Sequence, residues 1–344
     1  MKIKDSIMRG NMKILIIGGT GLISTSIAQQ LMDRGDDVTL LNRGRTPIRL
    51  KGEFCVLTGD RTDRPAFESL LRESGSWDCV IDMICSEPAD ASSLARVFKG
   101  RTAQLVFCST TNVYPKPADH YPVREDHRLG AAFKNGIDKA ECERIHRQAE
   151  KGGSYRATFI RPGHVYGEGG VVLHSLGNAT SFIDRIRHKL PVVVHGDGNS
   201  LWSALHAEDV AQVFTTVTGK TSAMGRTYNA TGTEWMTWDQ YHARIAESIA
   251  GELPEIVHIP TEQLTVLAPE RAAQCKRSLQ FPGVYDMAAA RNELGFCSRI
   301  SFVEGMRRTI KWLDTEGRID TWQSDPGYDK IIADWKSWTS RLRD

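Results

Sequence analysis

The sequence predicts an α/β protein, a doubly wound parallel sheet with a smaller α+β lobe in the second half of the chain. Two observations predict this fold. Short apolar segments alternate with helical segments up to about residue 160, and nearly continuous apolar strands are typical of a parallel sheet covered on both faces. A glycine-rich turn also separates the first strand from the first helix, at residues 18–21.

The elements of the first half follow from this alternation. Strands are expected at 13–17, 37–41, 54–58, 79–84, 104–108 and 157–160, and helices at 22–34, 65–73, 88–98 and 135–151. Right-handed crossovers between the parallel strands give the doubly wound arrangement. A loop at 114–133 interrupts the alternation, and loops of this length inside a compact domain are usually functional.

The second half has a looser pattern of short strands and helices. Strands are expected at 191–194, 227–230 and 255–259, and helices at 209–217, 238–249, 286–294, 302–313 and 328–342. We therefore expect a nucleotide-binding domain at 1–165. A substrate-binding lobe is expected at 166–344, with parts that return to the first domain.

Composition narrows the class of protein. Lys and Arg number 44 against 42 Asp and Glu, and this net charge of +2 gives no reason to expect a nucleic-acid-binding surface. No apolar run approaches the roughly 20 residues of a membrane span, and the N-terminal MKIKDSIMRGNM lacks the apolar core of a secretory signal. Seven cysteines without CxxC spacing and ten histidines without HxH or HExxH spacing indicate reduced thiols and no metal site. We expect a soluble, cytoplasmic, globular protein.

The glycine-rich turn predicts a dinucleotide site. Gly18, Thr20 and Gly21 follow a strand and open a helix. Glycines let the backbone approach a pyrophosphate, and the helix N-terminus offers N–H groups and a positive dipole end. Ser24 replaces the third glycine of the usual pattern, and serine is small enough to preserve close helix–sheet packing.

The end of the second strand bears on the choice of cofactor. Asn42, Arg43, Gly44 and Arg45 stand where an acidic residue would hold a ribose 2′-hydroxyl. Guanidinium groups attract a 2′-phosphate, so NADP is slightly favoured over NAD, unless the two arginines are a solvated surface pair. The pair Asp60-Arg61 follows the third strand, at the adenine edge, where Asp60 accepts a hydrogen bond from the amine or else caps a helix.

With these residues placed, the chain resembles the extended short-chain dehydrogenase/reductases, the NAD-dependent epimerase/dehydratase family. The motifs that carry the resemblance are GGTGLIS, NRG, GDRTD, FCSTTNVY, GIDKAECE, RPGHVYG, HGDGNSLWSALHAEDVA, YNATG and DMAAARNELGF. The resemblance implies a Rossmann domain that holds NAD(P), a C-terminal lobe that holds a sugar-like substrate, and a homodimer formed through two Rossmann-domain helices.

The resemblance also implies particular site residues. Those implied for the cofactor are Gly18, Thr20, Gly21, Leu22, Ile23, Asn42, Arg43, Arg45, Asp60, Arg61, Met83, Lys139 and Pro162. Those implied for the substrate are Thr111, Asn112, His164, Trp202 and His206.

The catalytic motif departs from the family pattern of Ser/Thr, Tyr and Lys. Thr110 and Lys139 match, but Asn135 stands four residues before Lys139 in place of the tyrosine. An asparagine amide donates and accepts hydrogen bonds but is not a general base. Three interpretations stay open. Another group transfers the proton, with His164, Tyr114 and Tyr166 as candidates; or Asn135 polarises a carbonyl and water supplies the proton; or the chain binds nucleotide without turnover. Lys139 binds the ribose in each.

A second departure concerns the substrate. Trp202 stands where nucleotide-sugar epimerases of the family carry a diphosphate-binding arginine, and a second such arginine is not evident in SLQFPGVYDMAA. An indole offers stacking instead of charge pairing. Substrates without a diphosphate therefore become plausible, unless Arg271 or Lys276 substitutes or Trp202 is a core residue.

The leading hypothesis is an NAD(P)-dependent epimerase/dehydratase- or dehydrogenase-type enzyme that acts by hydride transfer on a sugar, nucleotide sugar or related polyol. The alternative is a non-catalytic nucleotide-binding protein, associated with RNA as the chloroplast stem-loop-binding proteins are. The low net charge and the lack of a basic-aromatic tract argue against RNA binding.

Overall fold

The computed structural model describes residues 11–341, which form two compact units. The first unit runs to Val165 and also takes in Ala207–Thr231 and Tyr285–Ser298. The second comprises Tyr166–His206, Gly232–Val284 and the chain from Arg299 onward. Residues 1–10 of the sequence considered as a secretory signal, and the predicted end of the last helix at residue 342, lie outside the described residues.

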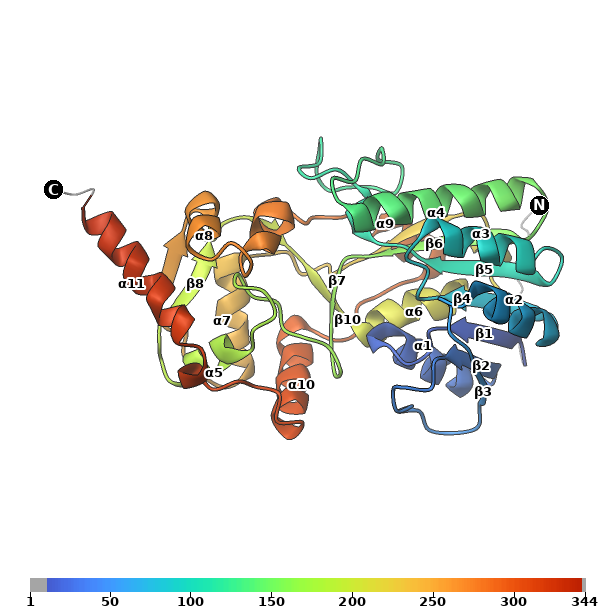
Figure 1. The fold of residues 1–344 in the computed structure, drawn as a ribbon, viewed down its shortest axis with the longest axis horizontal. Coiled ribbons are helices and arrows are strands. Elements are labelled where there is room, and N and C mark those ends of the chain that lie inside the picture. The colour runs from blue at the N-terminus through green and yellow to red at the C-terminus, as the bar shows by residue number, and fades with distance from the viewer. Residues whose placement is uncertain (1–10, 342–344) are drawn as a thin grey trace. The chain divides into compact units, whose positions relative to one another are not determined.

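The first unit is built on a seven-stranded sheet in which every pair of neighbours is parallel, which confirms the predicted fold class (Figure 1). The strands are β1 (Lys13–Ile17), β2 (Asp37–Asn42), β3 (Cys55–Thr58), β4 (Trp77–Asp82), β5 (Thr102–Cys108), β6 (Arg156–Pro162) and β11 (Thr227–Ala230). Their order is β11-β6-β5-β4-β1-β2-β3. The chain reverses direction across the sheet between β1 and β4, and ligands of doubly wound folds bind at that point.

Helices cover both faces of this sheet. They are α1 (Leu22–Asp33), α2 (Arg64–Glu73), α3 (Pro88–Val97), α4 (Lys134–Lys151), α6 (Ala207–Val217) and α9 (Ala288–Leu294), with a short 3₁₀ helix η1 at Thr111–Val113. α1 packs against α6, whereas α3 packs against α2 and α4. The residues of β1 from Ile14 to Ile17 are fully buried, as a central strand with apolar side chains on both faces requires.

Several predicted strand boundaries differ from the structure by one or two residues. The fourth strand ends at Asp82 rather than at residue 84, because the Asp82 carboxylate accepts the Ile84 N–H at 3.2 Å and turns the chain. The strand at 227–230 pairs with β6 and extends the large sheet.

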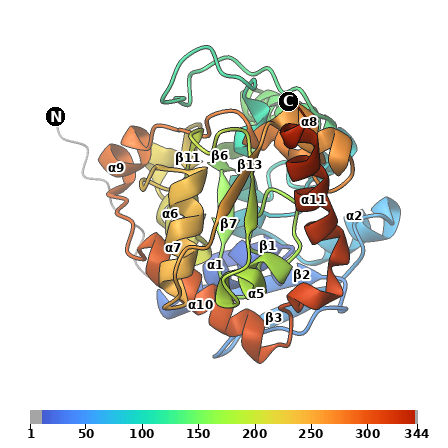
Figure 2. The ribbon, with the colours of Figure 1, turned by 90° about the vertical axis from the view of Figure 1, so that its left-hand side faces the viewer.

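The second unit is a smaller α+β body. Its helices are α5 (Ser181–Arg187), α7 (Trp238–Ser248), α8 (Thr261–Leu267), α10 (Phe302–Thr315) and α11 (Pro326–Ser340). Short strands are β8 (Val192–His195), β13 (Ile256–Ile259), β9 (Leu201–Trp202), β12 (Met236–Thr237) and β10 (Ala204–His206), and β7 (His164–Tyr166) leads into the unit. β8 and β13 form a parallel pair, and in Figure 2 α7 and α10 lie on one side of it and α11 on the other.

Tyr241, Trp238, Phe182 and Tyr328 are among the buried side chains of this second core. The sequence pattern missed α5 and α8, since seven residues hardly complete two turns and leave little periodicity to detect. No described helix combines the length and the apolar character that a membrane crossing requires.

Candidate functional site

The glycine-rich turn after β1 brings the backbone close to its neighbours and ends at the N-terminus of α1. Gly18 has a φ of 88°, and its N–H donates to the Leu41 carbonyl at 2.8 Å. A Cβ atom at Gly18 would lie 2.4 Å from Ile84 Cγ2, so a larger residue would displace Ile84 and strain the backbone. The buried Ser24 accepts the Gly21 N–H through its hydroxyl at 2.8 Å. The first turn of α1 therefore has the geometry that holds a pyrophosphate.

A cavity of about 700 Å³ surrounds this turn, and all of its lining belongs to the first unit. The predicted cofactor residues that line it are Gly18, Thr20, Gly21, Asn42, Arg43, Arg45, Asp60 and Arg61. Lining residues that were not predicted are Thr46, Gly59, Thr62, Arg64, Ile84, Ser86, Glu87 and Asp90. Most of these follow the carboxyl ends of β3 and β4, a position in the topology that signals a ligand site.

The remaining cofactor candidates lie outside this lining. Leu22 and Ile23 open α1, and Pro162 ends β6. Met83 follows β4, where its N–H donates to the Ile17 carbonyl at 3.0 Å.

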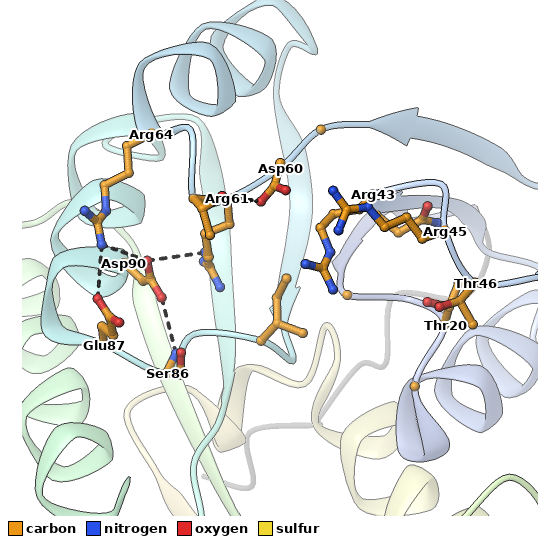
Figure 3. Close-up of a pocket in the computed structure, with 16 residues that line it drawn as sticks. Thr20, Arg43, Arg45, Thr46, Asp60, Arg61, Arg64, Ser86, Glu87 and Asp90 are labelled. Atoms are coloured by element: carbon orange, nitrogen blue, oxygen red, sulfur yellow. Dashed lines mark hydrogen bonds and ion pairs between the residues drawn. The ribbon is translucent and has the colours of Figure 1, made fainter. Parts of the chain in front are cut away.

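The turn after β2 carries two exposed arginines into the cavity. Asn42 Oδ1 accepts the Gly44 N–H at 2.8 Å, and Gly44 has a φ of 70°. This tight turn leaves Arg43 and Arg45 exposed on either side of the glycine. Figure 3 shows both side chains near Thr20 and Thr46, across the cavity from the cluster of Arg64, Glu87 and Asp90. The turn therefore presents two positive charges to the cavity.

Asp60 is an ionised carboxylate on the cavity wall. It accepts hydrogen bonds from the Thr62 N–H at 3.0 Å and the Thr62 hydroxyl at 2.8 Å. These bonds, and to a smaller extent the charges of Arg43 and Arg45, lower the pKa of Asp60. Asp63, whose carboxylate accepts the Ala66 N–H, is the residue that caps α2.

Arg61 is committed to a buried ion pair. Its guanidinium donates to both oxygens of Asp82, at 2.9 and 2.7 Å, and both side chains are buried. Burial alone would raise the pKa of Asp82, but the charge and hydrogen bonds of Arg61 outweigh it and the pKa is lowered. The pair ties the loop after β3 to the end of β4, so Arg61 shapes the cavity that it lines.

Thr110, Asn135 and Lys139, the positions predicted to match the catalytic motif, lie at η1 and on α4, which pack together. Thr110 caps η1, and its hydroxyl accepts the Asn112 N–H at 3.2 Å. A Cβ atom at Gly136 would lie 2.1 Å from the Asn112 carbonyl oxygen, so this unpredicted glycine lets the two helices touch. Asn135 is exposed in the first turn of α4, and one turn later Lys139 is buried and donates to the Cys108 carbonyl at 2.6 Å.

The predicted substrate residues beside them differ in exposure. Thr111 is buried and Asn112 is exposed, both in η1. His164 is half-buried in β7, and burial lowers its pKa to about 4, so its imidazole is neutral near pH 7.

Tyr114 belongs to a buried polar network. Its hydroxyl donates to Asn229 Oδ1 at 2.8 Å and accepts from Arg161 Nη1 at 2.8 Å. Arg161 also pairs with Glu143 at 2.7 Å, and Glu143 accepts the Ser109 hydroxyl at 2.6 Å. Burial raises the pKa of Tyr114. These contacts suit a residue that holds η1, α4 and β6 in place, and the sequence patterns had not singled out Glu143, Arg161 or Asn229.

Lys116 is a further residue that the sequence analysis missed. It lies in the loop at 114–133, two residues after Tyr114, and is partly buried. Burial lowers the pKa of its ammonium group to about 8. In the sequence, the only indication of a role for Lys116 was its position in the long loop that follows Thr110.

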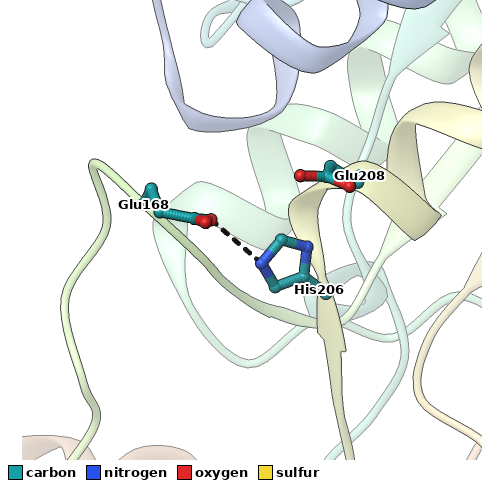
Figure 4. A group of neighbouring side chains, drawn as sticks. All are labelled: Glu168, His206 and Glu208. Carbon is teal, nitrogen blue, oxygen red and sulfur yellow. Dashed lines mark hydrogen bonds and ion pairs between the residues drawn. The ribbon is translucent and has the colours of Figure 1, made fainter. Parts of the chain in front are cut away.

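The other predicted residues belong to the second unit. Trp202 is buried and stacks on Trp238, with ring centroids 4.3 Å apart, as a core residue does. Tyr166 is buried and packs edge-on against His206. His206 in turn pairs with Glu168 at 3.1 Å (Figure 4).

Two cationic groups had been considered for a substrate phosphate. Arg271 is held by both oxygens of Asp325, at 2.9 and 2.7 Å. Lys276 is exposed on the helical turn Cys275–Leu279. Arg271 is therefore already neutralised within its own unit.

The fold and the glycine-rich cavity together define a dinucleotide-binding protein of the Rossmann class. The model of the NAD dependent epimerase/dehydratase family matches residues 14–231, and the chain belongs to that family. The family predicted from the motifs is thereby confirmed.

Relatives within this family differ in activity. The chain is 25% identical over 314 residues to 2′-dehydrokanamycin reductase of Streptomyces kanamyceticus, covering 90% of this chain and 86% of the relative. It is 27% identical over 307 residues to chloroplast stem-loop binding protein of 41 kDa b of Arabidopsis thaliana, covering 86% of this chain and 77% of the relative. An epimerase structure from Methanothermobacter thermautotrophicus has a TM-score of 0.73 at 16% identity, covering 90% of this chain and 94% of that one, and shares the fold.

Proposed function

We propose that the protein is an NADP-linked oxidoreductase that transfers hydride to or from a sugar carrying no nucleotide diphosphate. The observation that carries the proposal is the cavity of the first unit, with its glycine turn and its two exposed arginines. Arg43 and Arg45 stand where a carboxylate would repel a 2′-phosphate, and guanidinium groups bind phosphate through charge-assisted hydrogen bonds. NADP therefore fits this cavity better than NAD.

Each part of the cofactor has matching residues in the first unit. The N-terminus of α1 and the turn from Gly18 to Gly21 would hold the pyrophosphate. Asp60, kept ionised, would accept from the adenine amine, and Lys139 would hold the nicotinamide ribose. A bound nicotinamide supplies or accepts the hydride.

The residues around the substrate oxygen would position it and exchange its proton. We assign the Thr110 hydroxyl and the Asn135 amide to that oxygen, because η1 and α4 adjoin. Both groups stay neutral, so they hydrogen-bond the oxygen but do not take its proton. His164, with a pKa of about 4, is a weak base near neutrality. We assign the proton to Lys116, whose pKa of about 8 is close to the range in which acid–base groups work best.

The substrate class follows from what the second unit lacks. Trp202 replaces the expected arginine and is packed in the core, and Arg271 is neutralised by Asp325. A diphosphate would be left without these charge partners. The relative named 2′-dehydrokanamycin reductase supports a sugar substrate that is not a nucleotide sugar.

Nucleotide binding without turnover is the second candidate, associated with RNA. It is favoured by Asn135 in place of the tyrosine and by the similarity to a chloroplast stem-loop binding protein. Retention of RNA that weakens steeply with salt would support it.

We also propose a cytoplasmic homodimer. All seven cysteines are free thiols, which suits a reducing compartment. α3 and α4 are the helices offered to the partner, and Ile137 on α4 exposes about half of its surface. Light scattering of the purified chain measures the assembly directly.

A coupled measurement tests the function. The chain is mixed with NADPH and a panel of keto sugars, with and without nucleotide diphosphates, and loss of the reduced nicotinamide absorbance is followed. Turnover of free keto sugars with NADPH in preference to NADH supports the proposal. Turnover only of nucleotide sugars, or of none while RNA is retained, contradicts it.

A further inference from the structure

The second unit contains a cavity of its own at the carboxyl ends of β8 and β13. These strands pair in parallel, with His195 opposite Ile259 as the last pair. The loops that follow them line a cavity of about 560 Å³, within the size range of small-molecule sites. All of its lining lies in the second unit, and α8 and α11 lie beside the strands (Figure 1). The position is the one at which parallel strands present ligand sites.

A buried, unsatisfied donor lies in the cavity wall. His195 is only 2% exposed, and its Nδ1 lies 2.9 Å from the Ser175 hydroxyl, which already accepts the His195 backbone N–H. The Ser175 hydroxyl can donate to Nδ1, and in that tautomer the ring proton of the neutral imidazole sits on Nε2. Nε2 makes no well-aligned hydrogen bond among the described residues, and the nearby Leu279 carbonyl is already shared with the Trp238 indole N–H. A buried donor without a partner is costly, and a ligand oxygen would satisfy it.

His195 stays neutral in this setting. Burial lowers its pKa to about 4, although the Leu279 carbonyl, which accepts the Trp238 indole N–H at 3.1 Å, opposes the shift. A second buried polar atom, the Ser200 hydroxyl oxygen, likewise has no partner within the described chain. The cavity therefore offers two neutral hydrogen-bonding groups to a ligand.

The acidic groups of the cavity are Asp197 and Glu262, and the lining also includes His258, which is bonded to Asp239 at 2.8 Å. Asp197 lies in the turn after β8, where its side chain accepts the Asn199 N–H at 3.0 Å, and this bond lowers the pKa of Asp197. Glu262 opens α8 on the other side. Neither lysine nor arginine is among the residues that line the cavity. A phosphate would therefore be repelled, whereas a protonated amine would be attracted.

Trp335 gives the cavity an aromatic wall. It extends from α11, packs against the core of the second unit and lines the cavity. An indole face binds the apolar face of a saturated ring and attracts an ammonium group.

We propose that this cavity binds an aminated sugar, a hydroxylated ring that carries a protonated amine. Ring oxygens accept from His195 Nε2 and the Ser200 hydroxyl, the amine pairs with Asp197 and Glu262, and Trp335 covers the ring. The site is independent of the proposed hydride transfer, since binding here needs neither cofactor nor turnover.

The test is binding of glucosamine to the full chain without cofactor, followed by saturation-transfer NMR and calorimetry. N-acetylglucosamine has the same ring without the charge, and glucose 6-phosphate adds a negative charge. We expect glucosamine to bind about three- to tenfold more tightly than N-acetylglucosamine, the range for two partly exposed ion pairs, and glucose 6-phosphate to bind most weakly.

Variants locate the site. Asp197→Asn keeps the turn hydrogen bond and Glu262→Gln is conservative, and each should weaken glucosamine about two- to fivefold while leaving N-acetylglucosamine unchanged. Trp335→Leu should weaken both sugars. The matched controls are Glu247→Gln and Trp235→Leu, exposed positions of the second unit outside the cavity. Equal affinity for the charged and uncharged sugars, or glucosamine binding that neither carboxylate variant weakens, overturns the proposal.

Discussion

Replacement of Arg43 and Arg45 by serine tests whether the turn after β2 selects NADP. Both side chains are exposed and line the cavity of the first unit, so their removal leaves the core intact. The turn itself depends on the Asn42 side chain and on Gly44, which the substitutions keep. Any change in cofactor affinity therefore reports on the guanidinium groups rather than on the fold.

The expected magnitude follows from the hydrogen bonds to phosphate that each substitution removes. One charge-assisted hydrogen bond to a phosphate corresponds to about tenfold in affinity. Each single variant should thus lower the affinity for NADP about tenfold, and the double variant should lower it further. NAD has no 2′-phosphate, so its affinity should change less than twofold. Because both arginines are exposed, the NADP preference of the unmodified chain should also shrink as salt rises.

Calorimetric titration of both nucleotides gives the affinity ratio directly. Arg49→Ser is the matched control, an exposed arginine on the same segment that does not line the cavity. An unchanged NADP/NAD ratio in the double variant refutes the assignment of these arginines. An equal loss for both nucleotides would place them at the pyrophosphate instead.

Four further predictions concern the residues assigned to the nicotinamide end of the site and the buried network beside them. Lys139→Ala should weaken NADPH binding at least tenfold in a fluorescence titration, with partial recovery in Lys139→Arg. Asn135→Ala should lower kcat/KM for a keto sugar by about 10²-fold, since one donor to the reacting oxygen is lost, and Asn135→Tyr should lower it too by crowding. Sugar oxidation needs the neutral amine of Lys116, so the oxidation rate should rise as the pH is raised through about 8. Lys116→Met should abolish this rise. Arg161→Met leaves the buried Glu143 carboxylate with only the Ser109 hydroxyl and the more distant Arg147 as partners and should cost about 3 kcal/mol in urea unfolding.

For Asn135, Lys116 and Arg161 the contrary result would be equally specific. A rise in activity for Asn135→Tyr would mean that the site is a dormant form of the tyrosine-dependent one. A pH profile that is unaltered in Lys116→Met would mean that water or His164, and not Lys116, exchanges the proton. Unchanged stability in Arg161→Met would mean that the polar network beneath η1 is not structural.

Local pattern predicted the framework of the first unit well. The strand at 13–17, the glycine turn and the helix at 22–34 were placed within one residue of β1 and α1, because apolar periodicity and glycine geometry are properties of neighbouring residues. The cavity lining was predicted in part for the same reason, since Arg43, Arg45 and Asp60 directly follow strands.

Local sequence patterns could not predict contacts between side chains that are distant in the sequence. Arg61 was predicted beside the cofactor and lines the cavity, but its pairing with Asp82, 21 residues away, was not predicted. Trp202 looked like a substrate contact, yet Trp238 stacks on it. Both outcomes depend on which strands and helices meet, and that is decided by tertiary packing rather than by spacing along the chain.

The buried network around Tyr114 ties together the elements that carry the predicted site residues. Glu143 links α4 to β6 through Arg161, and Arg161 links β6 to the start of the long loop through Tyr114. These contacts hold Lys139 and Thr110 in place from below, whatever residue stands at position 135. Under the proposed function the framework of the site is thus separable from its proton-transfer group: a chain with Asn135 keeps the elements assigned to the cofactor and the substrate oxygen, while another side chain exchanges the proton.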